Sequence, residues 1–432
     1  MKQEIREFLW VATPKILGGG LQLLFGLILL RYLGPSEYGT LAVCLSAVLL
    51  ADAVLGAGTD MGVLRLAPLY EQHDPLRSLQ IQKAAWALKL AGTCILVIVI
   101  LAGRPLTQGW FQQPGEQYLL LLTVVSLLGL LALRSAQMYF QVRRAFAFYG
   151  AIDLLHSLLK FGGITAVVLL WVPSPARVLA VYALAPLVVG VAAAWTVKGL
   201  LRGAPLGLPA LRELWGLIRW YLLTVALGTV ITRMDLFLVS LLGGVAEAGI
   251  FSAAQTVVLV PLLIGAYLAV VFSPRIMPLW KEGRFEAVYL RFQSRLGLTC
   301  VVAYLGALLG IGRLGELFFP ASFQRATGVI LLLLPAALAA LYSFPWTVPF
   351  LLFARPRFLL AFDGSAFPFL VVLYAWAIRE HGAAGAAVVS SGFAIFKAAV
   401  MQFVAWSTLQ SGFPSNAPMG SSPAFETVRS VP

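Results

Sequence analysis

Long runs of apolar residues recur from one end of the chain to the other, separated by short segments rich in Gly, Pro and charged residues. A helix needs roughly 20 apolar residues to cross the hydrocarbon core of a bilayer, and many of these runs reach that length. They are continuous and do not alternate at period two, which excludes the strands of a membrane barrel. The pattern therefore predicts an all-α integral membrane protein.

Breaks in the apolar runs predict about twelve spans, six in each half of the chain. In the first half they lie near residues 8–33, 39–63, 84–103, 117–141, 149–171 and 178–200. In the second half they lie near residues 215–242, 248–273, 292–312, 325–353, 358–378 and 383–408. We expect one six-helix lobe over residues 1–203, a second over 204–409, and a disordered cytoplasmic tail over 410–432, which is rich in Ser, Pro and Gly.

Composition and charge agree with this prediction. Hydrophobic residues make up 60% of the 432 positions and charged residues only 11%, too few to solvate a globular surface. The chain carries a net charge of +13, but its basic residues are spread over alternate loops and form no nucleic-acid-binding stripe. Eighteen Lys and Arg fall on the side of the N-terminus and six on the other, which predicts that both termini are cytoplasmic in the inner membrane.

No segment predicts a catalytic or metal-binding domain. External loops are no longer than about 15 residues, and Cys44, Cys94 and Cys300 fall inside apolar runs without the spacing of metal ligands. The charged N-terminus runs into its apolar segment without a small-residue cleavage site, so we expect the first helix to be retained. We expect no metal, no cofactor and no nucleic-acid partner.

The two halves are related by an internal repeat. A shift of 210 residues superposes Gly34, Glu37 and Gly39 on Gly244, Glu247 and Gly249, and Trp10 and Gly18 on Trp220 and Gly228. Six spans per copy is an even number, so both copies enter the membrane in the same direction. This is the architecture of transporters in which two parallel halves rock about a central site. The alternative is a duplication that only builds a larger helical bundle.

Short motifs resemble those of a known family. They are the segment 31–39, Arg-Tyr-Leu-Gly-Pro-Ser-Glu-Tyr-Gly, the segment 233–235, Arg-Met-Asp, and the segment 249–254, Gly-Ile-Phe-Ser-Ala-Ala. With the 6+6 layout they resemble the polysaccharide transporter (Wzx-like oligosaccharide flippase) family of the multidrug/oligosaccharidyl-lipid/polysaccharide (MOP) superfamily. The resemblance covers essentially the whole membrane domain. Relatives of the lipid II flippase type often carry fourteen helices, and this chain has room for only twelve.

The resemblance implies two lobes around a central cavity, as in MATE-like folds, and a defined substrate. It implies translocation of undecaprenyl-pyrophosphate-linked oligosaccharide repeat units for surface polysaccharide biosynthesis. The partners implied are the lipid-linked oligosaccharide, membrane lipids, and a polysaccharide polymerase or export machinery.

Cationic side chains within the spans are candidates for binding substrate, because a charge in the membrane is costly unless it meets a cavity or a partner. A pyrophosphate in an apolar cavity needs Lys or Arg contacts. The candidates are Lys15, Arg134, Lys160, Arg233 and Lys397. Asp153, His156, Ser157 and Lys160 share one helical face, because they are spaced at i, i+3, i+4 and i+7.

Acidic residues and a histidine in the spans are candidates for ion coupling: Asp52, Asp153, His156 and Asp235. The alternative is that the charges pair with one another, Asp153 with Lys160 or Arg233 with Asp235, and only hold helices together. Lys89 and Arg219 lie near predicted cytoplasmic ends, where we expect them to snorkel to the interface. We expect Glu37 and Glu247 to form turns or caps.

Three functions remain open at the level of sequence. The leading one is a flippase that works by alternating access and is not an enzyme. The second is a cation-coupled multidrug exporter of the same superfamily, whose cavity should be rich in acids, whereas we expect this chain to place more bases than acids there. The third is a membrane glycan polymerase or ligase, which would need a sizeable external loop. The chain has no P-loop motif, so ATP hydrolysis is not expected.

Overall fold

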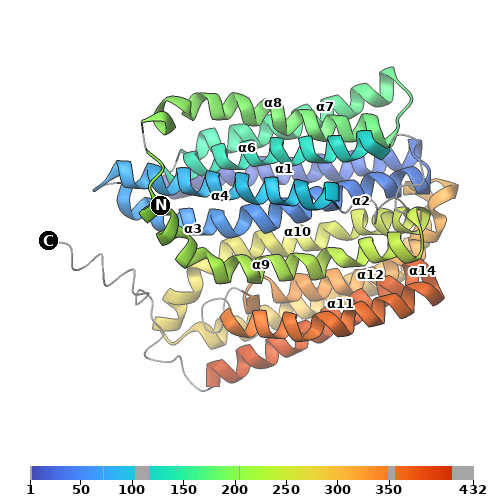
Figure 1. The fold of residues 1–432 in the computed structure, drawn as a ribbon. Helices are drawn as coiled ribbons and strands as arrows, with labels where there is room; N and C mark the ends of the chain where they lie inside the picture. The colour runs from blue at the N-terminus through green and yellow to red at the C-terminus, as the bar shows by residue number, and fades with distance from the viewer. Residues whose placement is uncertain are drawn as a thin grey trace.

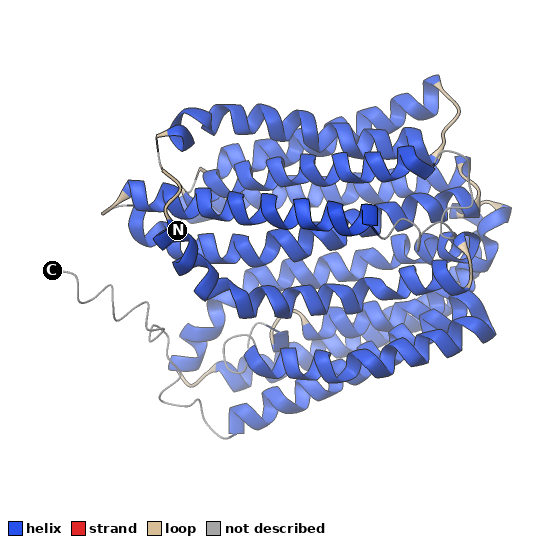
Figure 2. Cartoon of the chain, in the orientation of Figure 1, coloured by secondary structure: helices blue, strands red, loops and turns tan. Residues whose placement is uncertain are grey.

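The structure is a computed structural model that describes residues 2–71, 73–102, 116–143, 145–203, 205–348 and 356–410. These residues form helices and turns and contain no strand (Figure 2). The predicted tail covers residues 410–432, and all of it after Gln410 lies outside the described residues.

The helices of the first half follow the predicted spans and mostly extend beyond them. They are α1 (Lys2–Tyr32), α2 (Pro35–Asp52), the π-helix η1 (Ala53–Ala57), α3 (Gly58–Glu71), α4 (Pro75–Ala102), α6 (Glu116–Val142), α7 (Phe146–Leu170) and α8 (Pro175–Arg202). Proline begins α2, α4 and α8, where its missing N–H has no helical partner to lose. The span expected at 39–63 is interrupted by η1 and continues to Glu71 as α3.

The second half contains α9 (Leu208–Leu242), α10 (Val245–Lys281), α11 (Phe285–Phe318), a 3₁₀ turn η2 (Ala321–Phe323), α12 (Gln324–Ser343) and α14 (Pro356–Gln410). Gly382 breaks α14 with a φ of 58°, a left-handed conformation that glycine adopts readily. The carboxylate of Glu247 accepts a hydrogen bond from the N–H of Ala383 at 3.0 Å, so it caps the second part of α14. We call the two parts α14a and α14b.

The number of membrane crossings agrees with the prediction. Eleven helices of the described chain are long and apolar enough to cross a membrane, and α14 turns back at Gly382 to cross twice. Helix α1 begins, and α14 ends, at the same end of the bundle, on the left in Figure 1. We call this the basic end, and it also carries the turns at 73–74 and 282–284 and the described residues 205–207 that precede α9. The opposite end carries the turns at 33–34, 171–174 and 243–244.

Equivalent helices pack together in the two halves. Helix α1 packs on α7 in the first half, as α9 packs on α14 in the second; α6 packs on α8, as α12 packs on α14. The repeat-related glycines lie in the first of these contacts. A Cβ on Gly18 would lie 2.7 Å from Ser157 Oγ of α7, and one on Gly228 would lie 3.8 Å from Asp363 Oδ2 of α14a. The internal repeat is thus also a repeat of helix packing.

The halves meet at the opposite end through another repeat-related pair, Gly39 of α2 and Gly249 of α10. A Cβ on Gly39 would lie 1.9 Å from the carbonyl oxygen of Val245, and one on Gly249 would lie 1.9 Å from that of Pro35. Pro35 and Val245 are also separated by 210 residues, so each half presents the same backbone atoms to the other. Only glycine permits this approach of α2 to α10.

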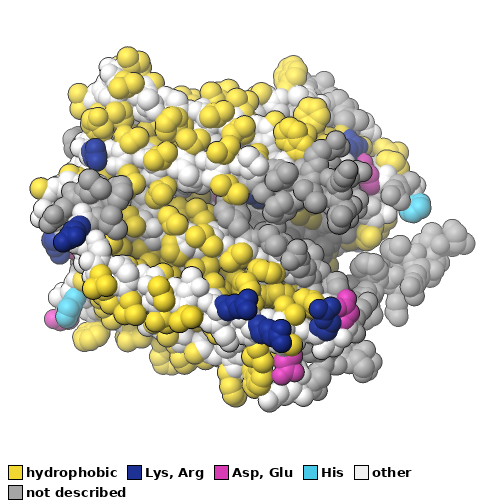
Figure 3. All heavy atoms as spheres, turned by 180° about the vertical axis from the view of Figure 1, so that it is seen from behind, with side chains coloured by type: hydrophobic (Ala, Val, Ile, Leu, Met, Phe, Trp, Pro, Cys, Tyr) yellow, Lys and Arg dark blue, Asp and Glu magenta, His cyan; other side chains and the backbone are white. Residues whose placement is uncertain are grey.

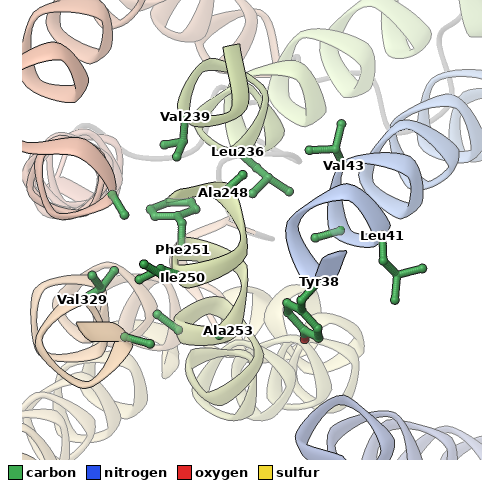
Figure 4. Close-up of a cluster of buried hydrophobic side chains, with 14 of the residues drawn as sticks. Tyr38, Leu41, Val43, Leu236, Val239, Ala248, Ile250, Phe251, Ala253 and Val329 are labelled. Atoms are coloured by element: carbon green, nitrogen blue, oxygen red, sulfur yellow. The ribbon is translucent and has the colours of Figure 1, made fainter. Parts of the chain in front are cut away.

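The main hydrophobic core surrounds this contact. It includes Tyr38, Val43, Leu236 and Phe251, so its side chains come from α2, α9 and α10 (Figure 4). The Tyr38 hydroxyl lies 3.0 Å from Thr256 Oγ1, which adds a polar link between α2 and α10. The interface between the halves is therefore packed like a protein core at this end.

A second contact joins the halves at the basic end. Glu213 of α9 accepts hydrogen bonds from the Tyr70 hydroxyl of α3 at 2.9 Å and from Arg77 Nη2 of α4 at 2.7 Å. Burial and the adjacent Glu213 carboxylate raise the pKa of Tyr70, so the hydroxyl stays protonated and donates. The start of α9 also packs Leu214 and Ile218 into a separate apolar cluster with side chains of α3, α4 and α6.

Hydrophobic side chains cover much of the outer surface. In Figure 3 they form a broad field, and the visible charged side chains lie in a few small groups, at both ends and in the lower middle of the view. Among the helices, α11 is exposed along most of its length, with only 6% of its apolar span buried. This exposure is what lipid contact requires, since lipid tails solvate apolar side chains as well as a core does.

Candidate substrate cavity

A cavity of about 640 Å³ lies between the two halves. Side chains of α1, α2 and α8 line it from the first half, and those of α9, α10, α12 and α14 line it from the second. Most lining side chains are apolar. The charged lining residues are Arg233, Asp235, Asp363 and Lys397, all from the second half.

Arg233 and Asp235 both line the cavity but do not pair. Residues two apart on a helix point in different directions, and no carboxylate of the described chain forms an ion pair with Arg233. Asp235 is buried, and its Oδ2 lies 3.2 Å from Gln255 Nε2 and 3.5 Å from Ser390 Oγ. The proposed Arg233–Asp235 pair is therefore absent, and the guanidinium is left for another partner.

Lys397 of α14b pairs with a carboxylate that the sequence analysis did not single out. Its ammonium lies 2.6 Å from Asp363 Oδ1 of α14a, and Asp363 is only 5% exposed. Asp363 is separated from Asp153 by 210 residues, so extending the repeat comparison to the fifth span of each half would have identified it. The Lys397–Asp363 pair joins the two parts of α14 on the cavity wall.

Lys160 and Lys15 lie outside the cavity lining. Lys160 Nζ is 5.0 Å from the ring centroid of Tyr182 and 5.8 Å from that of Phe25, and both rings line the cavity. Lys15 Nζ is 5.6 Å from the ring centroid of Tyr149. Neither lysine forms an ion pair with a carboxylate of the described residues, so the alternative pairing of Asp153 with Lys160 is not formed. Lys160 thus lies behind an aromatic layer of the wall.

Arg134 belongs to a polar network inside the first half. Its Nε lies 3.7 Å from Asp52 Oδ2, and its Nη1 donates to Gln137 Oε1 at 3.2 Å. Gln137 Nε2 donates in turn to Asp153 Oδ1 at 3.1 Å. His156 is buried on the helix that carries Asp153. The network lies outside the cavity lining, and the role of Asp52, Asp153 and His156 in ion coupling stays a prediction.

The π-helix η1 sits beside this network, between Asp52 and Asp60. A Cβ on Gly56 would lie 3.4 Å from Asp52 Oδ1 and 3.8 Å from Asp60 Oδ2, so both carboxylates approach the bulge. Asp60 forms an ion pair with Lys89, which is only 2% exposed. The expectation that Lys89 snorkels is therefore wrong: the partly buried carboxylate of Asp60 on a neighbouring helix holds its ammonium inside the first half. No periodicity in the sequence marks the extra residue that a π-helix inserts.

The charges that line the cavity are balanced, which corrects a second expectation. We expected more bases than acids in the cavity, but its lining holds Arg233 and Lys397 against Asp235 and Asp363. Among the predicted cationic candidates, Arg233 on the wall and Lys15 and Lys160 away from it form no ion pair with a carboxylate of the described residues. Of the predicted cationic candidates, the structure brings only Arg233 and Lys397 to the cavity.

A family model described as polysaccharide biosynthesis protein matches residues 5–280. The chain belongs to the polysaccharide biosynthesis protein family. The match spans the first half and the first two helices of the second, and it confirms the resemblance predicted from the motifs. No curated protein matches the chain in sequence.

Solved structures show how this family member folds. The lipid II flippase MurJ, in an inward closed conformation, superposes with a TM-score of 0.74 at 11% identity, over 94% of this chain and 88% of that one. An outward-facing MATE family multidrug resistance transporter of the MOP superfamily gives 0.66 at 13% identity, over 94% and 96%. A MOP superfamily transporter from Pyrococcus furiosus gives 0.61 at 14% identity, over 93% and 95%. The expected fold of two six-helix lobes around a central cavity is confirmed.

Proposed function

We propose that the protein is a flippase that moves undecaprenyl-pyrophosphate-linked oligosaccharide across the cytoplasmic membrane, with both termini in the cytoplasm. The observation that carries this proposal is a guanidinium, that of Arg233, on a cavity wall between the two halves without a carboxylate partner in the described chain. A pyrophosphate would supply the missing negative charge through a fork of N–H donors. Membership in a polysaccharide biosynthesis family supports a glycan-bearing substrate.

The remaining polar lining supports a sugar-bearing head group. Gln22, Gln255 and Thr256 line the cavity and offer hydrogen-bond donors and acceptors to hydroxyl groups. The apolar remainder keeps the cavity compatible with a lipid. Transport in this proposal proceeds by alternating access, in which the Gly39–Gly249 contact at the opposite end and the Glu213 contacts at the basic end, both formed in this structure, part in turn.

A cation-coupled exporter is the second candidate, and Asp235 favours it. This buried carboxylate lies on the cavity wall beside neutral donors and has no cationic partner within ion-pair distance in the described chain, so it suits a cation or a proton. The same carboxylate also fits ion coupling of a flippase. A membrane glycan polymerase or ligase has no specific observation in its favour.

The deciding experiment is transport by the purified protein in liposomes. Radiolabelled lipid-linked oligosaccharide is loaded, and its exposure on the far leaflet is measured with and without ion gradients. Arg233→Gln should lose most of this transport, while Arg284→Gln, on an exposed turn at the basic end, should retain it. Efflux of a cationic dye without movement of the lipid-linked glycan would overturn the proposal in favour of the exporter.

A cellular experiment tests the candidates in the first half. Deletion of the gene should cause lipid-linked repeat units to accumulate in the inner leaflet. We expect Arg134→Ala and Lys160→Ala to fail to complement this deletion at normal membrane levels. Full complementation by both variants would remove these residues from the substrate path and leave Arg233 and Lys397 as the charged contacts.

A further inference from the structure

An apolar groove of about 930 Å³ runs along the outer face of the second half. Helices α11, α12 and α14b line it, with Val301 and Leu305 on α11, Pro335 on α12, and Phe403 and Trp406 on α14b. Val301, Leu305 and Phe403 are exposed. The groove therefore faces the space that lipid tails occupy.

The wall between this groove and the central cavity is thin. Ala339 of α12 and Ala398 of α14b line both. Alanine side chains end at Cβ, so the seam between these two helices has little side-chain volume on either side. The preceding residue of α14b is informative: Lys397 lines the cavity alone, whereas Ala398 borders the groove as well.

We propose that this groove holds the polyisoprenoid chain of the carrier lipid while its diphosphate lies in the cavity near Lys397 and Arg233. The proposal rests on the proposed flippase function. A lipid with its head group inside the protein must pass its hydrocarbon chain between two helices to reach the bilayer. The Ala339–Ala398 seam separates the charged cavity from the apolar groove, and Lys397, the residue before Ala398, lies on the cavity side. A carrier lipid has the same arrangement, with a charged diphosphate joined directly to an apolar chain.

The free energy of moving the lipid chain from the bilayer into the groove limits how much the groove can contribute to transport. Lipid tails are as apolar as the groove, so transfer of the chain from the bilayer gains no hydrophobic free energy. What remains is van der Waals contact with a surface of fixed shape, including the rings of Tyr304, Tyr342 and Trp406. We therefore expect filling the groove to weaken transport by about tenfold, and not to abolish it.

Photocrosslinking tests the occupant directly. A photoreactive phenylalanine is placed at Val301 in the groove or, as a matched control, at Val302, the next residue of α11, which is outside the groove lining and equally exposed to lipid. The membrane-embedded full chain is irradiated with tritiated undecaprenyl diphosphate or tritiated phosphatidylglycerol. We expect the Val301 probe to capture undecaprenyl diphosphate several-fold more than the Val302 probe, with no such difference for phosphatidylglycerol.

Two outcomes would overturn the inference. One is equal capture of undecaprenyl diphosphate at both positions; the other is that the Val301 probe prefers phosphatidylglycerol, which would make the groove an ordinary lipid contact. Transport by the wild-type chain in the same membranes separates this test from that of the proposed function. Transport without selective capture at Val301 refutes the groove alone, whereas selective capture without transport refutes the flippase.

A functional variant supplies a second readout. Val301→Trp fills the groove and should reduce transport of the lipid-linked glycan about tenfold, whereas Val302→Trp adds the same ring to the lipid-facing side. Membrane levels of both variants are measured alongside. Equal transport by the two variants at equal levels would contradict the assignment.

Discussion

A single methyl group at Gly39 or Gly249 should shift the protein toward a state that is open at the opposite end. The added Cβ would lie 1.9 Å from a carbonyl oxygen of the other half, whereas ordinary contact begins at 3.4 Å, so α2 and α10 must separate locally by about 1.5 Å (3.4 − 1.9). Overpacking of this kind costs about 1–3 kcal/mol in the closed state. The open state, in which the helices part, avoids this cost. At about 1.4 kcal/mol per factor of ten, the equilibrium should move roughly 5- to 150-fold.

Cysteine accessibility measures this shift. A cysteine replaces Gln22 on the cavity wall in a background without Cys44, Cys94 and Cys300, and a membrane-impermeant maleimide is added on the outer side of spheroplasts.

Labelling should be faster in Gly39→Ala and Gly249→Ala, and fastest in the double variant. The control is Gly34→Ala in the neighbouring turn, where a Cβ meets nothing within 4 Å and φ is −70°. If the control and Gly39→Ala label at the same rate, the contact does not hold that end closed.

Three further predictions concern ion pairs. Asp363→Leu should leave Lys397 uncompensated and lower the thermal stability of the purified protein, while the double variant Asp363→Leu/Lys397→Met should recover it; no recovery would contradict the pairing. Lys89→Ala should remove about 3–5 kcal/mol by stranding Asp60, visible as reduced membrane levels, and normal levels would mean that the buried pair is dispensable. Glu213→Gln should cost at most about 1 kcal/mol, because the pair is partly exposed, but should speed maleimide labelling of the cavity from the basic end; unchanged labelling would exclude a closing role.

The number of spans and the repeat could be predicted from sequence because they depend on local properties. A run of apolar residues spans a bilayer wherever it occurs, and the glycines at 39 and 249 retain their register in both copies. The pairing of charges depends on which faces of neighbouring helices are in contact. The lengths of the spans do not determine which faces these are. Lys89 shows the difference: its position in the span predicted a snorkelling side chain, but Asp60, on the helix that follows the π-helix, holds it inside.

The repeat-related acids show why duplication does not give two equal sites. Asp153 and Asp363 occupy the same position in the two copies, yet Asp153 accepts from the neutral amide of Gln137 and Asp363 binds the ammonium of Lys397. Helix α6 supplies the first partner and α14b, the counterpart of α8, the second, so helices that are not equivalent in the repeat supply the partners of equivalent carboxylates. All charged residues of the cavity lining consequently come from the second half, while the first half contributes aromatic and polar side chains such as Phe25, Tyr182 and Gln22. For this reason, we expect loss of charge in the second half to affect substrate binding most directly, whereas the network around Arg134 acts on the wall from outside the cavity.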